Sequence, residues 1–258
     1  HIGAVSHMLV PTFPTVHLPN SMVRIHPSTT PGIRDNYLAS RIFNFALNVP
    51  AHRRDALGTV MITARAGTSS EEAIAAPYDR DHGTAAPHRY GVLLEEPDIF
   101  VEYAPTQHGA VYRFVPHEEG VYRVLFRCSG KGLYEGGANG VVQGVDEVNG
   151  LAQYLHAHLD ADIRGVEYFD REDRMAEPPD PQGLENCTVV EIRAGALDTI
   201  TLRTGISYIS GAQARQNFEK ETAAAPFGQG VDDAADRGNE VLGSIVVSGG
   251  TDDQQTVF

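Results

Sequence analysis

Between Tyr90 and Phe126 the chain reads YGVLLEEPDIFVEYAPTQHGAVYRFVPHEEGVYRVLF, and this stretch sets its structural class. Four short apolar segments alternate with connections that contain Pro, Gly, Asp and Glu. Within the segments apolar side chains tend to recur at every second position, which is the period of a strand with one buried face. Short strands joined in this way are typical of an antiparallel sandwich or barrel.

The same pattern extends from Val10 to about Ser210. Further apolar segments occur at 60–64, 187–192 and 199–203. Strands and helices do not alternate along this region, which argues against a parallel sheet. Residues 171–183, REDRMAEPPDPQG, are acidic and rich in Pro, and indicate a surface loop. We therefore expect a mainly β fold, a large antiparallel β-sandwich.

The pattern changes after Tyr208. Ser210 with Gln213 three residues later is a capping signature and predicts a helix. A second, weaker helical stretch is expected at 231–242, followed by a short strand at 244–247. Another capping signature at 249–254 predicts a helix that Phe258 interrupts after about two turns, too short to be stable alone. We read this terminus as a cut inside a longer polypeptide.

These boundaries divide the chain into three parts. Residues 1–8 are interpreted as the remnant of an expression tag, since they lack the charged and apolar regions of a signal peptide. Residues 9–208 form the expected sandwich domain. Residues 209–258 are expected to be linker helices that lead to an absent catalytic domain.

Composition excludes several classes of partner. The net charge of −14 argues against nucleic acid and anionic membranes, and no apolar run approaches the ~20 residues of a membrane-spanning helix. Residues 1–90 hold 8 Lys and Arg against 6 Asp and Glu, whereas residues 91–258 hold 12 against 28. This skew fits either ordinary solvation or a basic N-terminal third that faces an electronegative partner. Cys128 and Cys187 fit either one disulfide or two buried thiols.

Two kinds of cluster contain residue types that bind metals or act in glycoside hydrolysis. They are a group of His and Asp at 156–162 and pairs of adjacent carboxylates. On a strand over 154–162, His156, His158, Asp160 and Asp162 would share one face, as in a metal site or in any half-buried strand. A second metal-binding segment is not visible, so the ordinary strand is favoured. The paired carboxylates along the chain are adjacent in sequence and point apart. They do not predict the two carboxyls, ~6.5–9.5 Å apart, that hydrolyse a glycoside with inversion.

Two segments are rich in hydrogen-bond donors. They are HLPNSMVR at 17–24, and RIFNF with PAHRR at 41–45 and 50–54. Arg, His and Asn can donate to sugar hydroxyls, and Phe or Tyr can stack on a sugar ring. Taken alone, these segments are better interpreted as solvated loops with structural side chains.

Five ordered blocks carry a resemblance to a known family. They are Pro11–Pro27, Arg41–Thr68, Tyr78–Phe114, Gly205–Glu221 and Gly249–Phe258. In this order they resemble the N-terminal part of glycoside hydrolase family 92, over nearly the whole chain. Five blocks in order are far more specific than any single one.

The resemblance implies a supersandwich that short helices join to an (α/α)6 barrel. It also implies a calcium-dependent, inverting exo-α-mannosidase, with the calcium ion and both catalytic carboxyls in the barrel. No catalytic or metal-ligating residue is then expected in this chain. Carried over by position, the pocket loops of the family match 17–20 and 44–54. Asn20, Asn44, His52 and Arg53 are therefore expected to contact a mannose-containing glycan or the barrel.

The resemblance leaves several points open. It implies an extracytoplasmic setting, either secreted or periplasmic. The chain has no Trp, and Arg237-Gly238-Asn239 stands where a Trp-Asn pair is more usual, so the linkage cleaved is not fixed and a mannosyl-phosphate substrate stays open. The alternative functions are a non-catalytic carbohydrate-binding β-sandwich module, and a structural sandwich in an unrelated assembly.

Overall fold

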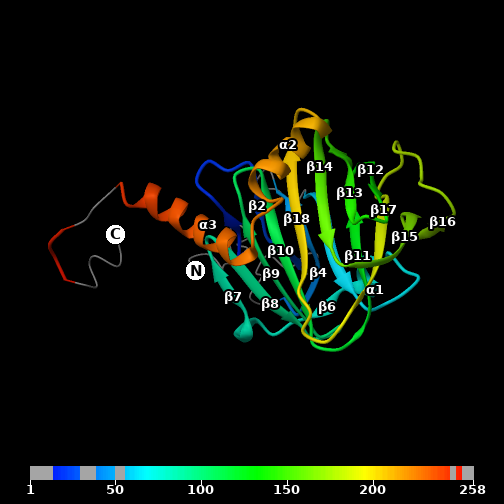
Figure 1. Cartoon of the computed structure of the whole chain (residues 1–258), viewed down its shortest axis with the longest axis horizontal. Helices are drawn as coiled ribbons and strands as arrows, with labels where there is room; N and C mark the ends of the chain where they lie inside the picture. Colours follow the sequence, from blue (N-terminus) through cyan, green and yellow to red (C-terminus); the bar gives the residue numbers. More distant parts are fainter. Residues whose placement is uncertain (1–13, 30–38, 50–55, 245–247, 252–258) are drawn as a thin grey trace.

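The computed structural model describes residues 14–29, 39–49, 56–244 and 248–251 of the 258-residue chain. Within these ranges the chain forms two eight-stranded antiparallel sheets that pack face to face (Figure 1). The expected mainly β sandwich is confirmed. A separate pair of short strands, β1 (Val16–His17) and β2 (Arg24–Ile25), lies beside the sheets.

The first sheet has the strand order β12-β13-β14-β18-β10-β9-β8-β7. Its strands are β7 (Thr84–Ala86), β8 (Arg89–Leu94), β9 (Ile99–Pro105), β10 (Gly109–Pro116), β12 (Lys131–Gly136), β13 (Val141–Val148), β14 (Leu151–Asp160) and β18 (Ile200–Ser207).

The second sheet has the order β16-β15-β17-β11-β5-β4-β3, with β6 paired to β4. Its strands are β3 (Pro27–Thr29), β4 (Arg41–Asn48), β5 (Leu57–Thr63), β6 (Ala76–Pro77), β11 (Gly120–Arg127), β15 (Asp162–Asp170), β16 (Asp173–Met175) and β17 (Cys187–Ala194). One helical turn, α1 (Glu71–Ile74), connects β5 to β6 within this sheet, and one 3-10 turn, η2 (Arg80–His82), lies on the connection from β6 to β7 of the first sheet.

The stretch from Tyr90 to Phe126 supplies four strands, as its pattern predicts. Strands β8, β9 and β10 are neighbours in the first sheet, whereas β11 belongs to the second sheet. Tyr103 and Tyr112 lie opposite each other in the β9–β10 register, and both are fully buried. Their ring centroids are 5.4 Å apart, and Phe45 of the second sheet lies 5.9 Å from Tyr103. Aromatic rings from both sheets therefore fill the centre of the sandwich.

One expected strand is divided between the two sheets. The expectation of a single strand over 154–162 is wrong, because β14 ends at Asp160 and Asp162 begins β15 of the opposite sheet. The four polar side chains expected on one face therefore do not share it. The acidic loop at 171–183 is largely exposed, as expected, and also contains the short edge strand β16.

Two helices follow β18, α2 (Gly211–Glu221) and α3 (Phe227–Leu242). The Oγ of Ser210 accepts a hydrogen bond from the backbone N–H of Gln213 at 3.1 Å, which confirms the predicted N-cap. The second helix begins earlier than expected and continues through Gly238. Residues 245–247 and 252–258, where a strand and a further helix were expected, lie outside the described residues.

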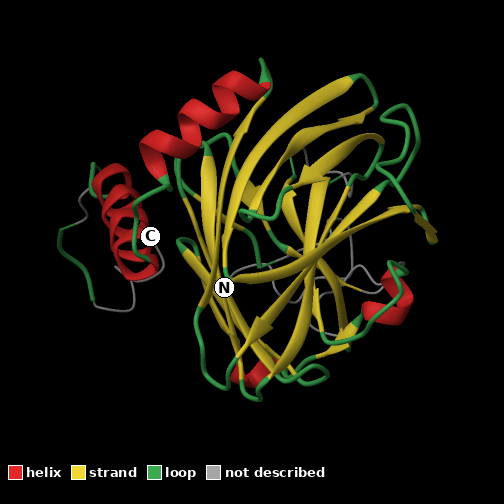
Figure 2. Ribbon diagram, turned by 45° about the vertical axis from the view of Figure 1, so that its right-hand side comes forward, coloured by secondary structure: helices red, strands yellow, loops and turns green. Residues whose placement is uncertain are grey.

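The helices lie against the outer face of the first sheet (Figure 2). A Cβ atom on Gly205 of β18 would come within 2.6 Å of the backbone of α2 at Ala214 and Phe218. Only a glycine lets the helix approach the strand this closely. Along the described part of the chain, no helix is both long and apolar enough to cross a membrane.

The sequence fits either one disulfide or two buried thiols. The structure shows Cys128 and Cys187 as two buried free thiols. Cys128 belongs to the core cluster between the sheets. Burial raises the pKa of both thiols, that of Cys187 to about 12.

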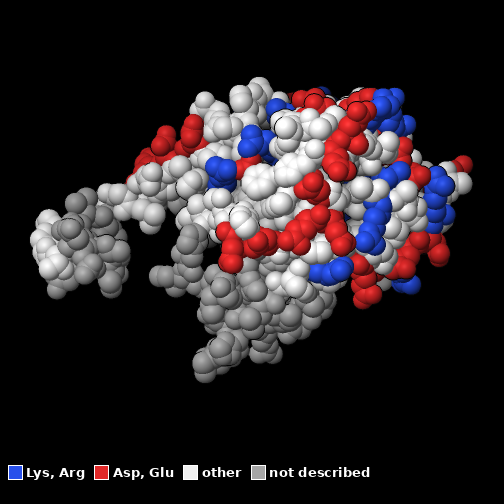
Figure 3. Space-filling view, turned by 90° about the horizontal axis from the view of Figure 1, so that it is seen from below, with Lys and Arg blue, Asp and Glu red and all other residues white. Residues whose placement is uncertain are grey.

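The end of the sandwich opposite α2 carries mixed surface charge (Figure 3). Exposed ion pairs join Arg65 to Glu96 at 3.5 Å and Arg193 to Glu119 at 2.8 Å. Exposed pairs of this kind contribute little to stability and mark a solvated surface.

Candidate functional site

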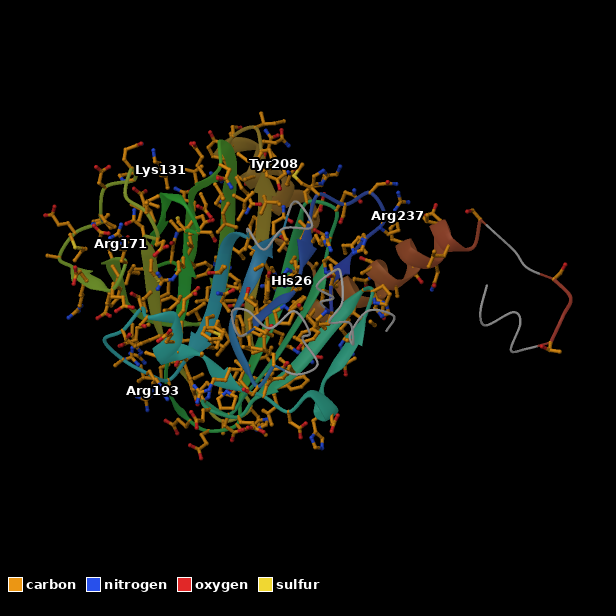
Figure 4. All side chains as sticks on the ribbon, turned by 180° about the vertical axis from the view of Figure 1, so that it is seen from behind. His26, Lys131, Arg171, Arg193, Tyr208 and Arg237 are labelled. Carbon is orange, nitrogen blue, oxygen red and sulfur yellow. The ribbon has the colours of Figure 1, made fainter. Side chains whose placement is uncertain are left out.

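The donor-rich turn at 17–24 and the end of β4 meet at one end of the sandwich, where β18 runs into α2. We call this the α2 end and define it by Asn20, Met22, Asn48, Gln107 and Tyr208, which hydrogen bonds join directly. Figure 4 shows Tyr208 there, at the opposite end of the molecule from Arg193.

Asn48, at the end of β4, is the central residue of the α2 end. Its side chain is fully buried. Its Oδ1 accepts from the backbone N–H of Arg24 at 2.9 Å. Its Nδ2 donates to the carbonyl of Met22 at 3.1 Å and to the hydroxyl of Tyr208 at 2.6 Å. The side-chain amide of Asn48 therefore joins the N-terminal turn, β2 and the start of the helical region. The same hydrogen bonds provide partners for its own buried oxygen and nitrogen atoms.

The turn that contains Asn20 is fixed from two sides. The N–H of Ser21 donates to the carbonyl of Leu18 at 3.1 Å, and Asn20 has a φ of 59°, which Asn tolerates better than most residues. The N–H of Met22 donates to the carbonyl of Gln107 at 2.9 Å, and the side-chain amide of Gln107 donates to the carbonyl of Asn20. The exposed side chain of Asn20 is therefore presented from a fixed backbone.

The β9–β10 hairpin also holds the last turn of α2. Glu221 accepts from the backbone N–H of His108 at 2.8 Å, and its other oxygen lies 2.6 Å from Nδ1 of the same residue. The carbonyl of His108 accepts from the N–H of Ile206 at 2.7 Å. The helix is thus joined to the same hairpin that supports the Asn20 turn.

Tyr208 is the first residue after β18. Burial raises the pKa of its hydroxyl to about 12, although the hydrogen bond with Asn48 acts in the opposite direction. The hydroxyl therefore stays protonated at neutral pH and can serve as a hydrogen-bond donor, not as a base.

A second set of contacts holds α3 against the first sheet. Glu102 of β9 is fully buried and forms ion pairs with Arg89 and Arg113, the latter with an Nε to Oε2 distance of 2.8 Å. The guanidinium of Arg113 lies 4.8 Å from the ring centroid of Phe227, the first residue of α3. A cation over an aromatic face is attractive. Glu102 therefore holds Arg113 where its guanidinium contacts Phe227 at the start of α3.

The four residues expected in the site fall into three groups. Asn20 belongs to the α2 end. Asn44 lies in the middle of β4, where its Nδ2 donates to Oε1 of Glu71 at 2.8 Å and its buried Oδ1 has no hydrogen-bond partner among the described residues. His52 and Arg53 lie outside the described residues. The structure therefore brings the turn of Asn20 close to Asn48 at the end of β4 and leaves Asn44 further down the strand.

Sequence reasoning missed the residues that connect this end, namely Asn48, Gln107 and Tyr208. A signal for Asn48 exists, because it is polar at the end of the apolar run FALN, and a buried amide needs partners. Tyr208 and Gln107 have no local signal, since their role depends on contacts with residues more than 80 positions away.

Two acidic side chains of the described part are fully buried, Glu102 and Asp146. No group of three or more His, Cys, Asp or Glu side chains could hold a metal ion there. Glu102 is fully engaged by two arginines. Asp146 is buried and accepts from the backbone N–H groups of Gly58, Ser129 and Gly130 at 2.7–2.9 Å. Its pKa is raised because burial outweighs these bonds. Its partners are all backbone groups, as expected of a structural carboxylate.

The fold defines a class of protein, a two-sheet antiparallel sandwich domain followed by two helices. The model of the glycosyl hydrolase family 92 N-terminal domain matches residues 1–207. The chain belongs to this family, as the resemblance predicts. No curated protein matches the chain.

Solved structures with the same fold include family 92 mannosidases. The inverting mannosidase BT2199 of Bacteroides thetaiotaomicron has a TM-score of 0.83 at 21% identity, over 98% of this chain and 36% of that one. The family 92 hydrolase ccman5 has a TM-score of 0.82 at 20% identity, over 96% and 37%. The α-mannosidase BT3965 of Bacteroides thetaiotaomicron, also solved with mannoimidazole, has a TM-score of 0.83 at 15% identity, over 99% and 39%. The chain therefore spans less than two fifths of the length of these structures.

Proposed function

We propose that this chain is the N-terminal part of an inverting exo-α-mannosidase that removes terminal α-linked mannose from glycans. In this proposal the sandwich supplies loops of the substrate pocket and a separate (α/α)6 barrel supplies the catalytic carboxyls. Membership of family 92 supports the hydrolase class, and the similarity to solved family 92 mannosidases supports mannosidase activity.

The proposed roles of sandwich and barrel rest on one observation, the hydrogen-bond network at the α2 end. Asn48, the last residue of β4, joins the Asn20 turn to Tyr208, directly before the helices. Side chains presented from a fixed backbone can orient a sugar before the reaction, and such positioning contributes much of an enzyme's rate. Asn20 and Arg53 are proposed to contact the terminal mannose or the barrel, with His52 beside them. Asn44 is proposed to support the strand that leads there.

Inversion requires one carboxylic acid to protonate the leaving oxygen and one carboxylate to activate water on the opposite side of the ring. Glu102 and Asp146, the two fully buried acids of the described part, are engaged by arginines and by backbone N–H groups. Both catalytic groups are proposed to belong to the barrel. Calcium would supply a hard cation for sugar hydroxyls, and we also place it there, because the described residues offer no ligand set. We propose an extracytoplasmic location, where glycans occur.

A direct test measures mannose release from α-1,2-mannobiose by the purified chain, with calcium and then with a chelator. We expect no release in either condition. Calcium-dependent release would place the catalytic carboxyls within these 258 residues and contradict the proposal.

A second test uses a polypeptide in which the sandwich is joined to the proposed catalytic part. Arg53→Ala should raise KM for the mannobiose by about tenfold, the loss expected for one good hydrogen bond to substrate. Arg65→Ala, at the opposite end of the sandwich, is the control and should leave KM unchanged. Equal kinetics of the two variants would remove Arg53 from the site.

A further inference from the structure

A groove of about 600 Å³ crosses the outer face of the first sheet beside α2. Its floor is formed by β12, β13 and β14, one wall by the first turn of α2, and the other by the loop at Pro181. Its volume lies within the range of small-molecule sites in proteins, roughly 300–1,000 Å³. Paired strands form the floor, so the groove exists before any ligand binds.

The strand register arranges the floor in two rows. Leu133 lies opposite Val145, and Val145 lies opposite Tyr154, which makes one row apolar and ends it with an aromatic ring. In the next row on the same face Glu135 lies opposite Gln143, and both are exposed. Rows on one face of a sheet are about 6.6 Å apart, which is close to the width of a sugar ring.

The helix adds a third element to the groove. Arg215 lines it from α2, and its Nε donates to Oε1 of Glu219 at 2.8 Å. Gly211 lies at the edge of the Tyr154 ring, where an added Cβ would be 4.0 Å from Cδ1. A larger residue at this position would cover the ring. Gly211 therefore keeps this side of the groove open.

The polar groups of the groove floor are free to bind a ligand. In the described part of the chain, the side chains of Glu135 and Gln143 and the hydroxyl of Tyr154 make no hydrogen bond. Glu135 and the ion pair of Arg215 with Glu219 give no net positive charge, which favours a neutral ligand over a phosphate. The groove thus has one apolar row that ends in an aromatic ring and one row of amide and carboxylate groups. These two rows match a sugar, whose apolar face would lie on the first row and whose hydroxyls would lie on the second.

The backbone groups of β13 and β14 are paired with strands on both sides, so the centre of the floor is not suited to adding a peptide strand. We propose that it binds an oligosaccharide with α-linked mannose, with Tyr154 under a sugar ring and Glu135, Gln143 and Arg215 on the hydroxyls. The choice of mannose rests on the proposed function. The groove would hold part of a glycan whose end is processed elsewhere in the protein.

Saturation-transfer NMR of the full 258-residue chain with α-1,2-mannobiose tests this inference. We expect binding with a Kd of about 1 mM, typical of a shallow site, and weaker binding of the α-1,2-linked glucose disaccharide. Gln143→Ala and Arg215→Ala, both at exposed positions, should weaken binding about fivefold, and Tyr154→Ala about tenfold. Matched controls are Glu147→Ala, on the same face of β13, and Arg237→Ala, an exposed arginine of α3 in a similar helical ion pair. The controls should bind as the unaltered chain does.

Absence of binding up to about 10 mM would overturn the inference, and so would binding that the groove variants leave unchanged. Equal affinity for the glucose disaccharide would overturn the assignment to mannosides. The measurement needs no hydrolysis, so its failure is separate from failure of the proposed function. Binding by a chain whose longer parent releases no mannose would uphold the groove and contradict the mannosidase.

Discussion

The side-chain amide of Asn48 lies 2.6 Å from the hydroxyl of Tyr208, although 160 residues separate them. Asn48 ends a strand of the second sheet and Tyr208 follows the last strand of the first. The contact therefore joins the two sheets at the point where the chain enters its helices. Because both groups are largely removed from water, the loss of either leaves its partner unsatisfied.

Asn48→Ala should lower the free energy of unfolding by about 2–4 kcal/mol. The substitution removes the hydrogen bonds that Asn48 makes with the Met22 carbonyl, the Arg24 N–H and the Tyr208 hydroxyl. A buried group that loses its hydrogen bond costs about 1–3 kcal/mol, with some relief from relaxation. Urea denaturation followed by circular dichroism measures the change. Asn239→Ala, at an exposed position of α3, should change the value by less than about 0.5 kcal/mol. A similar small effect at Asn48 would contradict the role given to it.

Gly205→Ala should displace α2 from the sheet. The added Cβ would lie 2.5 Å from the N atom of Phe218 and 2.6 Å from the O atom of Ala214, and backbone atoms cannot move aside cheaply. We expect a loss of about 2 kcal/mol or more, together with faster amide hydrogen exchange in 211–221. Gly238→Ala in α3 meets no atom within 4 Å and should be neutral or stabilising by up to about 1 kcal/mol. Unchanged exchange in α2 would show that the close approach is not required.

Glu102→Gln should destabilise the chain and loosen the start of α3. The change leaves Arg89 and Arg113 without their carboxylate, and breaking a buried ion pair costs about 3–5 kcal/mol. Both guanidiniums are about one third exposed, so we expect roughly 2 kcal/mol. Glu119→Gln removes the exposed pair with Arg193 and should cost less than about 0.5 kcal/mol. Equal effects of the two substitutions would contradict this account of Glu102.

Much of the fold could be predicted from local sequence pattern. The period-2 segments within 90–126 became β8 to β11 with shifts of one or two residues at their ends, and the Ser210–Gln213 cap began α2 where expected. These features are local, since they depend on which face of a strand is buried and on which side chain satisfies a helix end. The division at Ala161 was missed because the pattern of polar residues continues across the point where the chain changes sheets.

The candidate site was harder to predict from the sequence than the fold was. Asn20 could be selected as a turn residue in a donor-rich segment, but Gln107, which fixes its turn, comes from the β9–β10 hairpin that only the fold brings near it. The groove beside α2 depends on the register of Leu133, Val145 and Tyr154 across three strands. Register between strands is set by packing over the whole sheet, and no single segment encodes it.

The thiols should be unreactive in the folded chain. Burial raises the pKa of Cys128 and Cys187, so the thiolate that attacks a disulfide reagent is scarce, and the reagent cannot reach either sulfur. Ellman's reagent at pH 8 should label neither cysteine within minutes, and both at once in guanidinium chloride. Rapid labelling of one thiol without denaturant would show that its site opens.

Protonation of His156 should weaken the packing of α2 on the sheet. Its ring lies 4.9 Å from that of Phe218, edge to face, and burial, followed by the charge of Arg215, lowers its pKa. The unfolded chain then binds the proton more readily than the folded chain between the lowered pKa and about 6.5. The stability contributed by neutral His156 is therefore present above about pH 6.5 and is lost as the pH falls through this window.

Denaturation midpoints measured from pH 8 to pH 5 should fall more steeply for the unaltered chain than for His156→Phe. Phenylalanine keeps an aromatic contact with Phe218 and cannot take up a proton, so the difference between the two chains isolates this one group from His26, whose pKa burial also lowers. His82→Phe, at an exposed position, is the control and should retain the slope of the unaltered chain. Parallel pH profiles for the unaltered chain and His156→Phe would mean that the imidazole titrates alike in the folded and unfolded states, and α2 would then not respond to its charge.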